Sequence, residues 1–145
     1  MAQARRHSLF EKPRPGGRVD APLLGLEEAP GVDGHEDVGG RAVAPDMPGL
    51  ADVDYLTNVG ILDLDTVPEH LVVIGGSYIA LEFAQMFRRF GAKVTVIEKG
   101  PRLTSREDED VSAAIKDILE AEGIDVVVDA DSIRFAKQDS GFTVT

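Results

Sequence analysis

The sequence predicts an α/β protein with a truncated Rossmann-type βαβαβ parallel sheet and a C-terminal β-hairpin, preceded by a largely irregular N-terminal segment. Two short runs, residues 71–74 and 94–97, are largely apolar and mostly β-branched, as expected of parallel strands that are covered on both faces. A glycine turn and a segment of helical period follow the first run. This order of strand, turn and helix is typical of doubly wound folds.

The N-terminal segment has the composition of chain that lacks a packed core. Residues 1–45 hold seven Gly and five Pro, which reaches the roughly 25–30% level of low-complexity sequence. We therefore expect residues 1–37 to be an irregular or disordered tail. The basic residues of this region are Arg5, Arg6, Lys12, Arg14 and Arg18. Because no amphipathic face accompanies them, a solvated tail is favoured over a basic arm or a transit-like leader.

The first folded elements surround the glycine turn. Thr57 is expected to cap a short helical turn that runs to Leu64, ahead of the first strand. The first helix is predicted from Tyr78 to Phe90, because its apolar residues recur at helical spacing and Gly91 follows it. Its packing face is expected to comprise Ile79, Ala80, Phe83, Ala84 and Phe87.

The second half of the chain repeats strand and helix. Thr104 and Glu107 match a capping box and predict the start of a second helix. Its apolar stripe is expected at Val111, Ile115, Ile118 and Leu119. Gly123 ends that helix, residues 124–128 form a third strand, and residues 133–137 and 142–145 form the hairpin.

Composition excludes several classes of function. A formal net charge of -11 opposes broad contact with the phosphate backbone of a nucleic acid. The absence of Cys excludes disulfides and thiolate nucleophiles, and with only three His we expect no metal site. No apolar run approaches the roughly 18 residues of a membrane span, so we expect no membrane contact and a cytoplasmic protein.

The chemistry is concentrated at the first strand-to-helix turn. Gly75, Ser77 and Ala80 occupy the three positions of a G-x-G-x-x-G/A fingerprint in the context that a dinucleotide site requires. Gly75 allows the tight turn, and Ala80 allows close helix packing. Ser77 departs from the usual glycine and either crowds the pyrophosphate or donates its hydroxyl to it. The alternative is a tight turn that binds no ligand. The preceding strand, the following helix and an acid further along the chain together disfavour that alternative.

The downstream acid is Glu98, at the end of the second strand, where a carboxylate can accept hydrogen bonds from a ribose diol. The same charge would repel a 2′-phosphate, so NAD(H) is favoured over NADP(H). Lys99 and Arg102 lie just beyond and could hold a phosphate, which keeps NADP(H) open. The other interpretation of Glu98 is a solvated acid without a ligand.

At this point the residues resemble a known family, the pyridine nucleotide-disulfide oxidoreductases. These are FAD enzymes that include dihydrolipoamide dehydrogenase, glutathione reductase and mercuric reductase. The string "PEHLVVIGGSYIALEFAQMFRRFGAKVTVIEKGPRL" looks like the start of the NAD(P)H-binding domain of that family, closest to its mercuric-reductase-like members. The string "VGGRAVAPDMPGL" is similar to the end of the FAD domain. The resemblance covers residues 38–145.

The resemblance implies roles for matching positions. The cofactor-binding residues it suggests are Gly75, Gly76, Ser77, Tyr78, Ile79, Glu98, Lys99 and Arg102. Tyr78 falls where some members place an aromatic gate over the flavin, and Glu82 where they place a carboxylate that pairs with a flavin-side lysine. Both roles need an FAD domain. The alternatives are a half-buried aromatic for Tyr78 and a solvated helix acid for Glu82.

The chain also departs from the family. It lacks the FAD fingerprint, the redox-active cysteine pair and the C-terminal dimerisation domain, so we expect a fragment that binds a nicotinamide dinucleotide without turnover. The expected organisation is a tail over 1–37, an FAD-domain exit and linker over 38–57, and an incomplete NAD(P)H-binding domain over 58–145. FAD belongs to the parent enzyme, whose family is homodimeric. Mercuric ion, a disulfide and a quinone stay open as terminal acceptors.

Two further classes stay open for the chain itself. One is an NAD-sensing regulatory module, which would use the same turn without a flavin. The other is a non-catalytic remnant or interaction protein. An S-adenosylmethionine methyltransferase also has a glycine-rich turn and a strand-end acid, but the "YIALEF" helix start resembles the reductase family instead.

Overall fold

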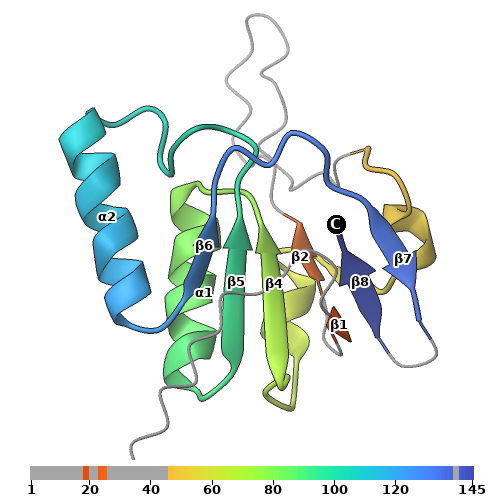
Figure 1. Ribbon diagram of the computed structural model, residues 1–145. Helices are drawn as coiled ribbons and strands as arrows, with labels where there is room; N and C mark the ends of the chain where they lie inside the picture. The colour runs from red at the N-terminus through yellow and green to blue at the C-terminus, as the bar shows by residue number, and fades with distance from the viewer. Residues whose placement is uncertain (1–17, 20–22, 26–45, 139–140) are drawn as a thin grey trace, which may run out of the picture.

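The computed structural model describes residues 18–19, 23–25, 46–138 and 141–145 (Figure 1). A five-stranded parallel sheet has the order β3-β2-β4-β5-β6, and a three-stranded antiparallel sheet has the order β1-β8-β7. The parallel strands are β2 (Leu23–Gly25), β3 (Tyr55–Leu56), β4 (His70–Ile74), β5 (Lys93–Ile97) and β6 (Asp125–Val127). The antiparallel strands are β1 (Arg18–Val19), β7 (Phe135–Lys137) and β8 (Phe142–Val144). The predicted fold class is confirmed.

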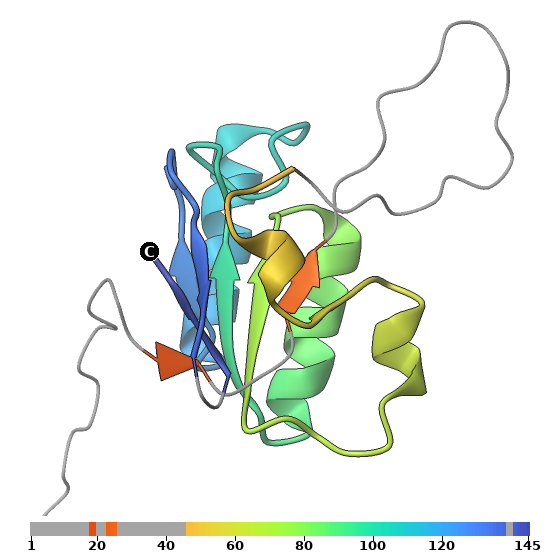
Figure 2. The same cartoon turned by 90° about the vertical axis from the view of Figure 1, so that its right-hand side faces the viewer.

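The parallel sheet is covered on both faces. Helices α1 (Tyr78–Arg89) and α2 (Glu109–Ala121) pack on one face, and the antiparallel sheet and the short 3-10 helix η1 (Leu50–Asp52) pack on the other (Figures 1 and 2). A second 3-10 helix, η2 (Gly60–Asp63), precedes β4. Alternate residues of β4 supply the two cores, since Leu71 and Val73 face the helices while Val72 and Ile74 face the antiparallel sheet. Because each face of β4 packs against a core, residues 71–74 are all apolar.

The register of β4 and β5 determines where the site forms. Ile74 is the partner of Ile97, so both strands end at the same edge of the sheet. The Gly75 N–H then donates to the Ile97 carbonyl at 2.8 Å. Because parallel strands end together, the turn after β4 and Glu98 after β5 lie next to each other, although Gly76 and Glu98 are 22 positions apart in the sequence.

Helix α1 follows its predicted packing face closely. Ala80 and Ala84 have no exposed surface, which allows the helix to approach the sheet, and Phe87 is buried beside them. Gly91, with φ 103°, terminates the helix in the left-handed conformation that glycine adopts at low cost. Ile79 differs from the prediction because it is exposed. Within the described ranges, no helix has the length and apolar character that crossing a membrane requires.

Helix α2 corrects two predictions. It begins at Glu109 with Asp108 as its N-cap residue, so Thr104 and Glu107 are not its capping box. Its buried face carries Ser112 and Leu119, with Ile115 partly buried. The predicted stripe members Val111 and Ile118 are exposed instead. The buried stripe therefore runs through Ser112, Ile115 and Leu119, which are about one helical turn apart.

Part of the predicted irregular tail is also corrected. The segments Arg18–Val19 and Leu23–Gly25 are strands, and the second of them lies between β3 and β4 in the parallel sheet. Local composition did not indicate them, because a two- or three-residue strand is stabilised by its neighbours rather than by its own sequence. The rest of the predicted tail, and the N-terminal part of the linker, lie outside the described residues.

Candidate functional site

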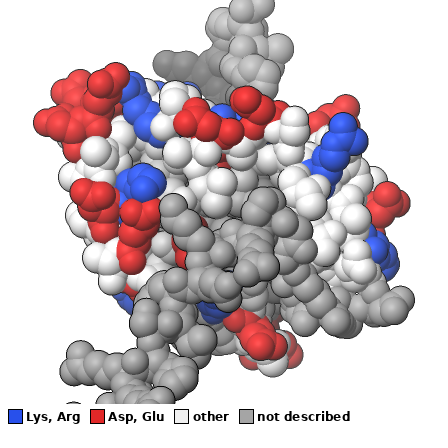
Figure 3. Space-filling model, in the orientation of Figure 1, with Lys and Arg blue, Asp and Glu red and all other residues white. Residues whose placement is uncertain are grey.

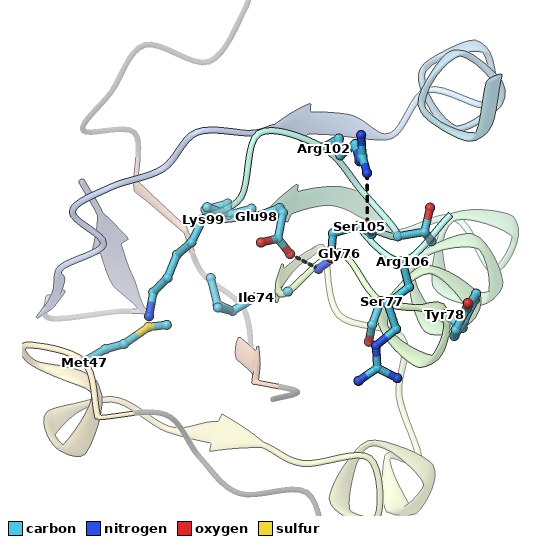
Figure 4. A pocket seen from close by; sticks show the side chains of 13 residues that line it. Met47, Ile74, Gly76, Ser77, Tyr78, Glu98, Lys99, Arg102, Ser105 and Arg106 are labelled. Atoms are coloured by element: carbon cyan, nitrogen blue, oxygen red, sulfur yellow. Dashed lines mark hydrogen bonds between the residues drawn. The ribbon is translucent and has the colours of Figure 1, made fainter. Parts of the chain in front are cut away.

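A pocket lies at the carboxyl ends of β4 and β5 (Figure 4). Its volume is about 280 Å³, slightly below the ~300–1,000 Å³ that is usual for pockets enclosing a whole drug-sized ligand. Seven of the predicted site residues line it, namely Gly75, Gly76, Ser77, Tyr78, Glu98, Lys99 and Arg102. The predicted Ile79 and Glu82 are not part of the wall and are both exposed. A pocket of this size takes part of a dinucleotide rather than all of it.

The turn after β4 requires glycine at two positions for two different reasons. Gly75 has φ 106°, which L side chains rarely adopt. Gly76 is crowded, because a Cβ there would lie 2.8 Å from Glu98 Oε2 and 2.8 Å from Leu103 Cδ2. The pair of glycines therefore provides both the tight turn and the close approach of the turn to its neighbours.

The N-terminus of α1 opens onto this pocket. Ser77 is its N-cap residue and has extended backbone, with no side-chain hydrogen bond to the first helical turn. The leading N–H groups of a helix have no intrahelical acceptor, and the helix dipole adds partial positive charge at this end. This combination favours an anionic ligand such as a pyrophosphate. The Ser77 hydroxyl adds a further donor group beside it.

The carboxylate of Glu98 joins two loops at the pocket. Its Oε2 accepts a hydrogen bond from the Gly76 N–H at 2.5 Å (Figure 4). Its Oε1 accepts one from the Gly100 N–H at 2.7 Å. The carboxylate is partly buried, and each of its oxygens still has a second lone pair for a ligand hydroxyl. Glu98 is therefore held in one orientation and retains the capacity to bind a diol.

Three basic side chains line the pocket, Lys99, Arg102 and Arg106. Arg102 is engaged within the protein, because its Nη1 contacts Glu109 Oε1 at 2.9 Å and its Nη2 donates to the Ser105 carbonyl at 3.1 Å. Exposed acids Asp108, Glu109 and Asp110 surround the start of α2, where Figure 3 shows acidic atoms gathered. These acids, and the ion pair with Glu109 above all, therefore reduce the positive charge that Arg102 presents to a ligand phosphate.

Tyr78 joins the first turn of α1 to the segment between β5 and α2. Its hydroxyl donates a hydrogen bond to Glu107 Oε1 at 2.5 Å, while the residue stays 51% exposed. Glu107 is predicted from the sequence to cap α2, but its side chain binds Tyr78 instead. The hydrogen bond from Tyr78 to Glu107 therefore holds the aromatic side chain of the pocket wall, although the sequence predicts that Glu107 caps α2.

Sequence reasoning missed six residues of the pocket wall: Met47, Ile74, Ile97, Thr104, Ser105 and Arg106. Ile74 and Ile97 are expected from the sequence only as buried strand residues. The segment 104–106 follows the strand-end acid closely, so proximity to Glu98 in the sequence was the signal available. Met47 had no local signal, because only its packing in the core on the second face of the sheet brings it to the site.

The donor set fits part of a nicotinamide dinucleotide. Backbone N–H groups and hydroxyls at the start of α1 suit a pyrophosphate, and the oriented Glu98 suits a ribose diol. One further polar atom has no protein partner, because Thr104 lines this pocket and its Oγ1 is buried without a hydrogen bond. A ligand with acceptor oxygens would supply the missing partner.

Comparison with known proteins gives a consistent picture. Residues 38–145 match the family described as pyridine nucleotide-disulphide oxidoreductase. A mercuric reductase of Streptomyces lividans is 46% identical over 88 residues, which are 61% of this chain and 18% of that protein. A probable pyridine nucleotide-disulfide oxidoreductase of Escherichia coli K12, RclA, is 35% identical over 105 residues, which are 72% of this chain and 24% of that protein.

Solved structures agree with the sequence matches. The HOCl-induced flavoprotein disulfide reductase RclA from Escherichia coli superposes with a TM-score of 0.62 at 32% identity, and the match covers 74% of this chain and 27% of that one. The chain spans less than a quarter of the length of the two curated relatives described above, with shares of 18% and 24%.

Proposed function

The chain belongs to the pyridine nucleotide-disulphide oxidoreductase family, and from this premise we propose that it is the NAD(P)H-binding portion of an FAD-dependent oxidoreductase. In this proposal residues 58–145 form the nicotinamide-nucleotide domain, and residues 38–57 form the exit from the flavin domain. The portion positions nicotinamide for hydride transfer to a flavin, and the isolated chain binds the dinucleotide without turnover.

One observation carries the proposal. Glu98 is held by the N–H groups of Gly76 and Gly100 beside the start of a helix whose N-cap makes no side-chain bond. A carboxylate in that position serves a ribose while the helix start serves the phosphates. A glycine turn without a ligand would not need an acid oriented by two loops at once.

The dinucleotide, when bound, supplies the hydride, and the residues of this chain bind and orient it. The Gly75–Ser77 turn and the first N–H groups of α1 hold the pyrophosphate. Glu98 holds the adenosine ribose through its free lone pairs. Fixing the phosphates and ribose restricts the remaining half of the molecule, and this lowers the entropic cost of reaching the acceptor.

We favour NAD(H) over NADP(H) as the ligand. The Glu98 carboxylate would repel a 2′-phosphate, and the Arg102 charge is already paired with Glu109. Lys99 and Arg106 lie on the same wall and are the groups through which NADP(H) would bind if it were accepted.

Two side chains have proposed roles that need a flavin partner. Tyr78 would cover the nicotinamide position, and Glu82 would pair with a lysine of the flavin side. Both residues are exposed at the start of α1, as contact with another domain requires. The terminal acceptor, whether mercuric ion, a disulfide or a quinone, would be set by parts of the enzyme outside this pocket. We further propose a cytoplasmic protein without nucleic-acid partners.

The experiment is calorimetric titration of the full chain with NADH and NADPH, compared with the variant Glu98→Ala. We expect NADH to bind and the variant to bind it about tenfold more weakly, because a ribose acceptor is lost and two loops are released. Glu120→Gln is the matched control, since Glu120 pairs with Lys116 on α2 away from the pocket. A chain that is folded by circular dichroism and binds neither nucleotide refutes the proposal.

A further inference from the structure

Thr104 lies against the glycine turn. Its N–H donates to the Gly76 carbonyl at 2.8 Å, and its own carbonyl accepts from the Glu107 N–H at 2.8 Å. The residue lines the pocket and is only 6% exposed. Thr104 is therefore anchored by its backbone beside the turn that precedes α1.

Two unfavourable features coincide at this residue. Thr104 has φ 43°, a left-handed conformation that is unusual for a β-branched side chain. Its Oγ1 is buried without a hydrogen-bond partner, although buried hydroxyls are normally satisfied. Strained backbone and unpaired polar groups concentrate at functional sites, where a ligand completes the interactions.

Within the described part of the chain, only one other buried side-chain oxygen has no hydrogen-bond partner, Glu122 Oε2. Glu122 is otherwise engaged, since its Oε1 accepts from Gln85 at 3.0 Å and contacts Arg89 at 3.1 Å. It is not part of the pocket wall. Of the two unpaired oxygens, only that of Thr104 therefore belongs to a residue that lines the pocket.

We propose that Thr104 is a ligand-binding residue whose hydroxyl donates a hydrogen bond to a phosphate oxygen of the bound dinucleotide. The inference rests on the proposed function and assigns a new contact within that site. A phosphate is favoured over the ribose because Glu98 already supplies the acceptor that a ribose diol requires, whereas the Thr104 hydroxyl supplies a donor beside the turn that precedes α1. A hydroxyl donor and a phosphate acceptor also form a strong, charge-assisted pair.

The test compares two Thr→Val substitutions in the full chain. Thr104→Val keeps the β-branch and removes an unpaired hydroxyl. Thr95→Val removes a hydroxyl that has a partner, because Thr95 Oγ1 bonds to His70 Nε2 at 2.9 Å. Thr95 is similarly buried but does not line the pocket. Dissociation constants for NADH and ADP are measured by calorimetry, and melting temperatures by circular dichroism. ADP carries the pyrophosphate without the nicotinamide.

Thr104→Val is expected to weaken NADH and ADP alike by about tenfold without lowering the melting temperature. Thr95→Val is expected to lower the melting temperature and leave both affinities unchanged. Thr104→Ser, which keeps the hydroxyl, is expected to bind like the wild type, and it decides the question if Thr104→Val does not fold.

Several results would overturn the inference. Affinities of Thr104→Val within twofold of the wild type would do so, as would a loss seen with NADH but not with ADP. An equal loss in Thr104→Ser, or a fall in melting temperature as large as that of Thr95→Val, would assign Thr104 a structural role. Failure of the wild type to bind either nucleotide would instead refute the proposed function, so the two failures are distinguishable.

Discussion

The Glu98 carboxylate accepts a hydrogen bond from the Gly76 N–H at 2.5 Å across two neighbouring strand ends. The bond connects the acid proposed to hold a ribose to the turn proposed to hold a pyrophosphate. A second bond, from the Gly100 N–H, completes the connection at 2.7 Å. The two halves of the site are therefore coupled, and a change in one alters the other.

The first prediction tests this coupling at Gly76. Gly76→Ala would place a Cβ 2.8 Å from Glu98 Oε2 and from Leu103 Cδ2, so the carboxylate must move. We expect a loss of about 1–3 kcal/mol in the free energy of unfolding, measured with urea, together with weaker NADH binding. Gly60→Ala is the control, because its Cβ would meet only Leu56 Cδ2 at an ordinary 3.5 Å. Wild-type affinity in Gly76→Ala would contradict the prediction.

A second prediction concerns the selection between NADH and NADPH. Arg102 contacts Glu109 at 2.9 Å, with 34% and 89% of the two side chains exposed. Such an exposed pair contributes about 0–1 kcal/mol, so Glu109→Gln should release Arg102 at little cost in stability. We expect NADPH affinity to rise up to about fivefold while NADH affinity stays constant. Calorimetry with both nucleotides measures the ratio.

The control for that experiment is on the same helix. Glu120→Gln breaks the ion pair with Lys116, which is 2.7 Å long and lies away from the pocket. This variant should leave the ratio of the two affinities unaltered. An unchanged ratio in Glu109→Gln as well would show that Arg102 does not face the 2′-position of the nucleotide.

A third prediction follows from His70 at the opposite end of β4. Burial lowers the pKa of His70 from 6.5 to about 4, with the charge of Lys93 acting in the same direction and Asp125 opposing the change. Because the folded-state pKa lies below the unfolded value, the unfolded chain binds the proton first as pH falls. The stabilisation is complete above pH 6.5 and is lost as pH falls from 6.5 toward about 4.

Urea unfolding at pH 7 and pH 5 measures this effect. After discounting for solvent screening of a partly exposed imidazole, we expect His70 to account for about 1 kcal/mol of the loss. His70→Gln removes the titrating group and should show a correspondingly smaller loss between the two pH values. Equal losses in the wild type and the variant would mean that carboxylates alone determine the pH dependence.

A fourth prediction uses the aromatic composition of the chain, which has two Tyr and no Trp. In a Tyr55→Phe background, Tyr78 is the only tyrosine fluorophore. Its hydroxyl donates to the Glu107 carboxylate, and such a bond quenches phenol emission because the carboxylate accepts the proton in the excited state. Glu107→Ala should therefore increase the emission, whereas Glu120→Gln in the same background should not. Equal emission in all three proteins would exclude a persistent Tyr78–Glu107 bond in solution.

The periodic parts of the fold could be predicted from the sequence. The runs that became β4 and β5 are largely apolar, and a strand covered on both faces needs that pattern. Helix α1 was predictable for a similar reason, since Ala80 and Ala84 lie about one turn apart. The short strands β1 and β2 were not predictable, because their pairing depends on partners distant in the sequence.

The segment after β5 shows where local reasoning failed. Thr104 and Glu107 have the spacing of a capping box, but the Thr104 N–H bonds to Gly76 and the Glu107 carboxylate to Tyr78. Both partners come from the preceding strand-helix turn. The local sequence matches a capping box, but tertiary contacts with the strand-helix turn take the hydrogen-bonding groups that the capping box would use.

The strand-turn-helix order, the glycine turn and the acid at the end of β5 could all be predicted from local sequence, because each depends on neighbouring residues and a known period. The bonds of Glu98 to Gly76 and Gly100, the pairing of Arg102 with Glu109 and the strained backbone and unpaired hydroxyl of Thr104 appear only in the folded chain. These features depend on which loops meet at one edge of the sheet. That meeting is set by strand register and packing, which no local pattern encodes.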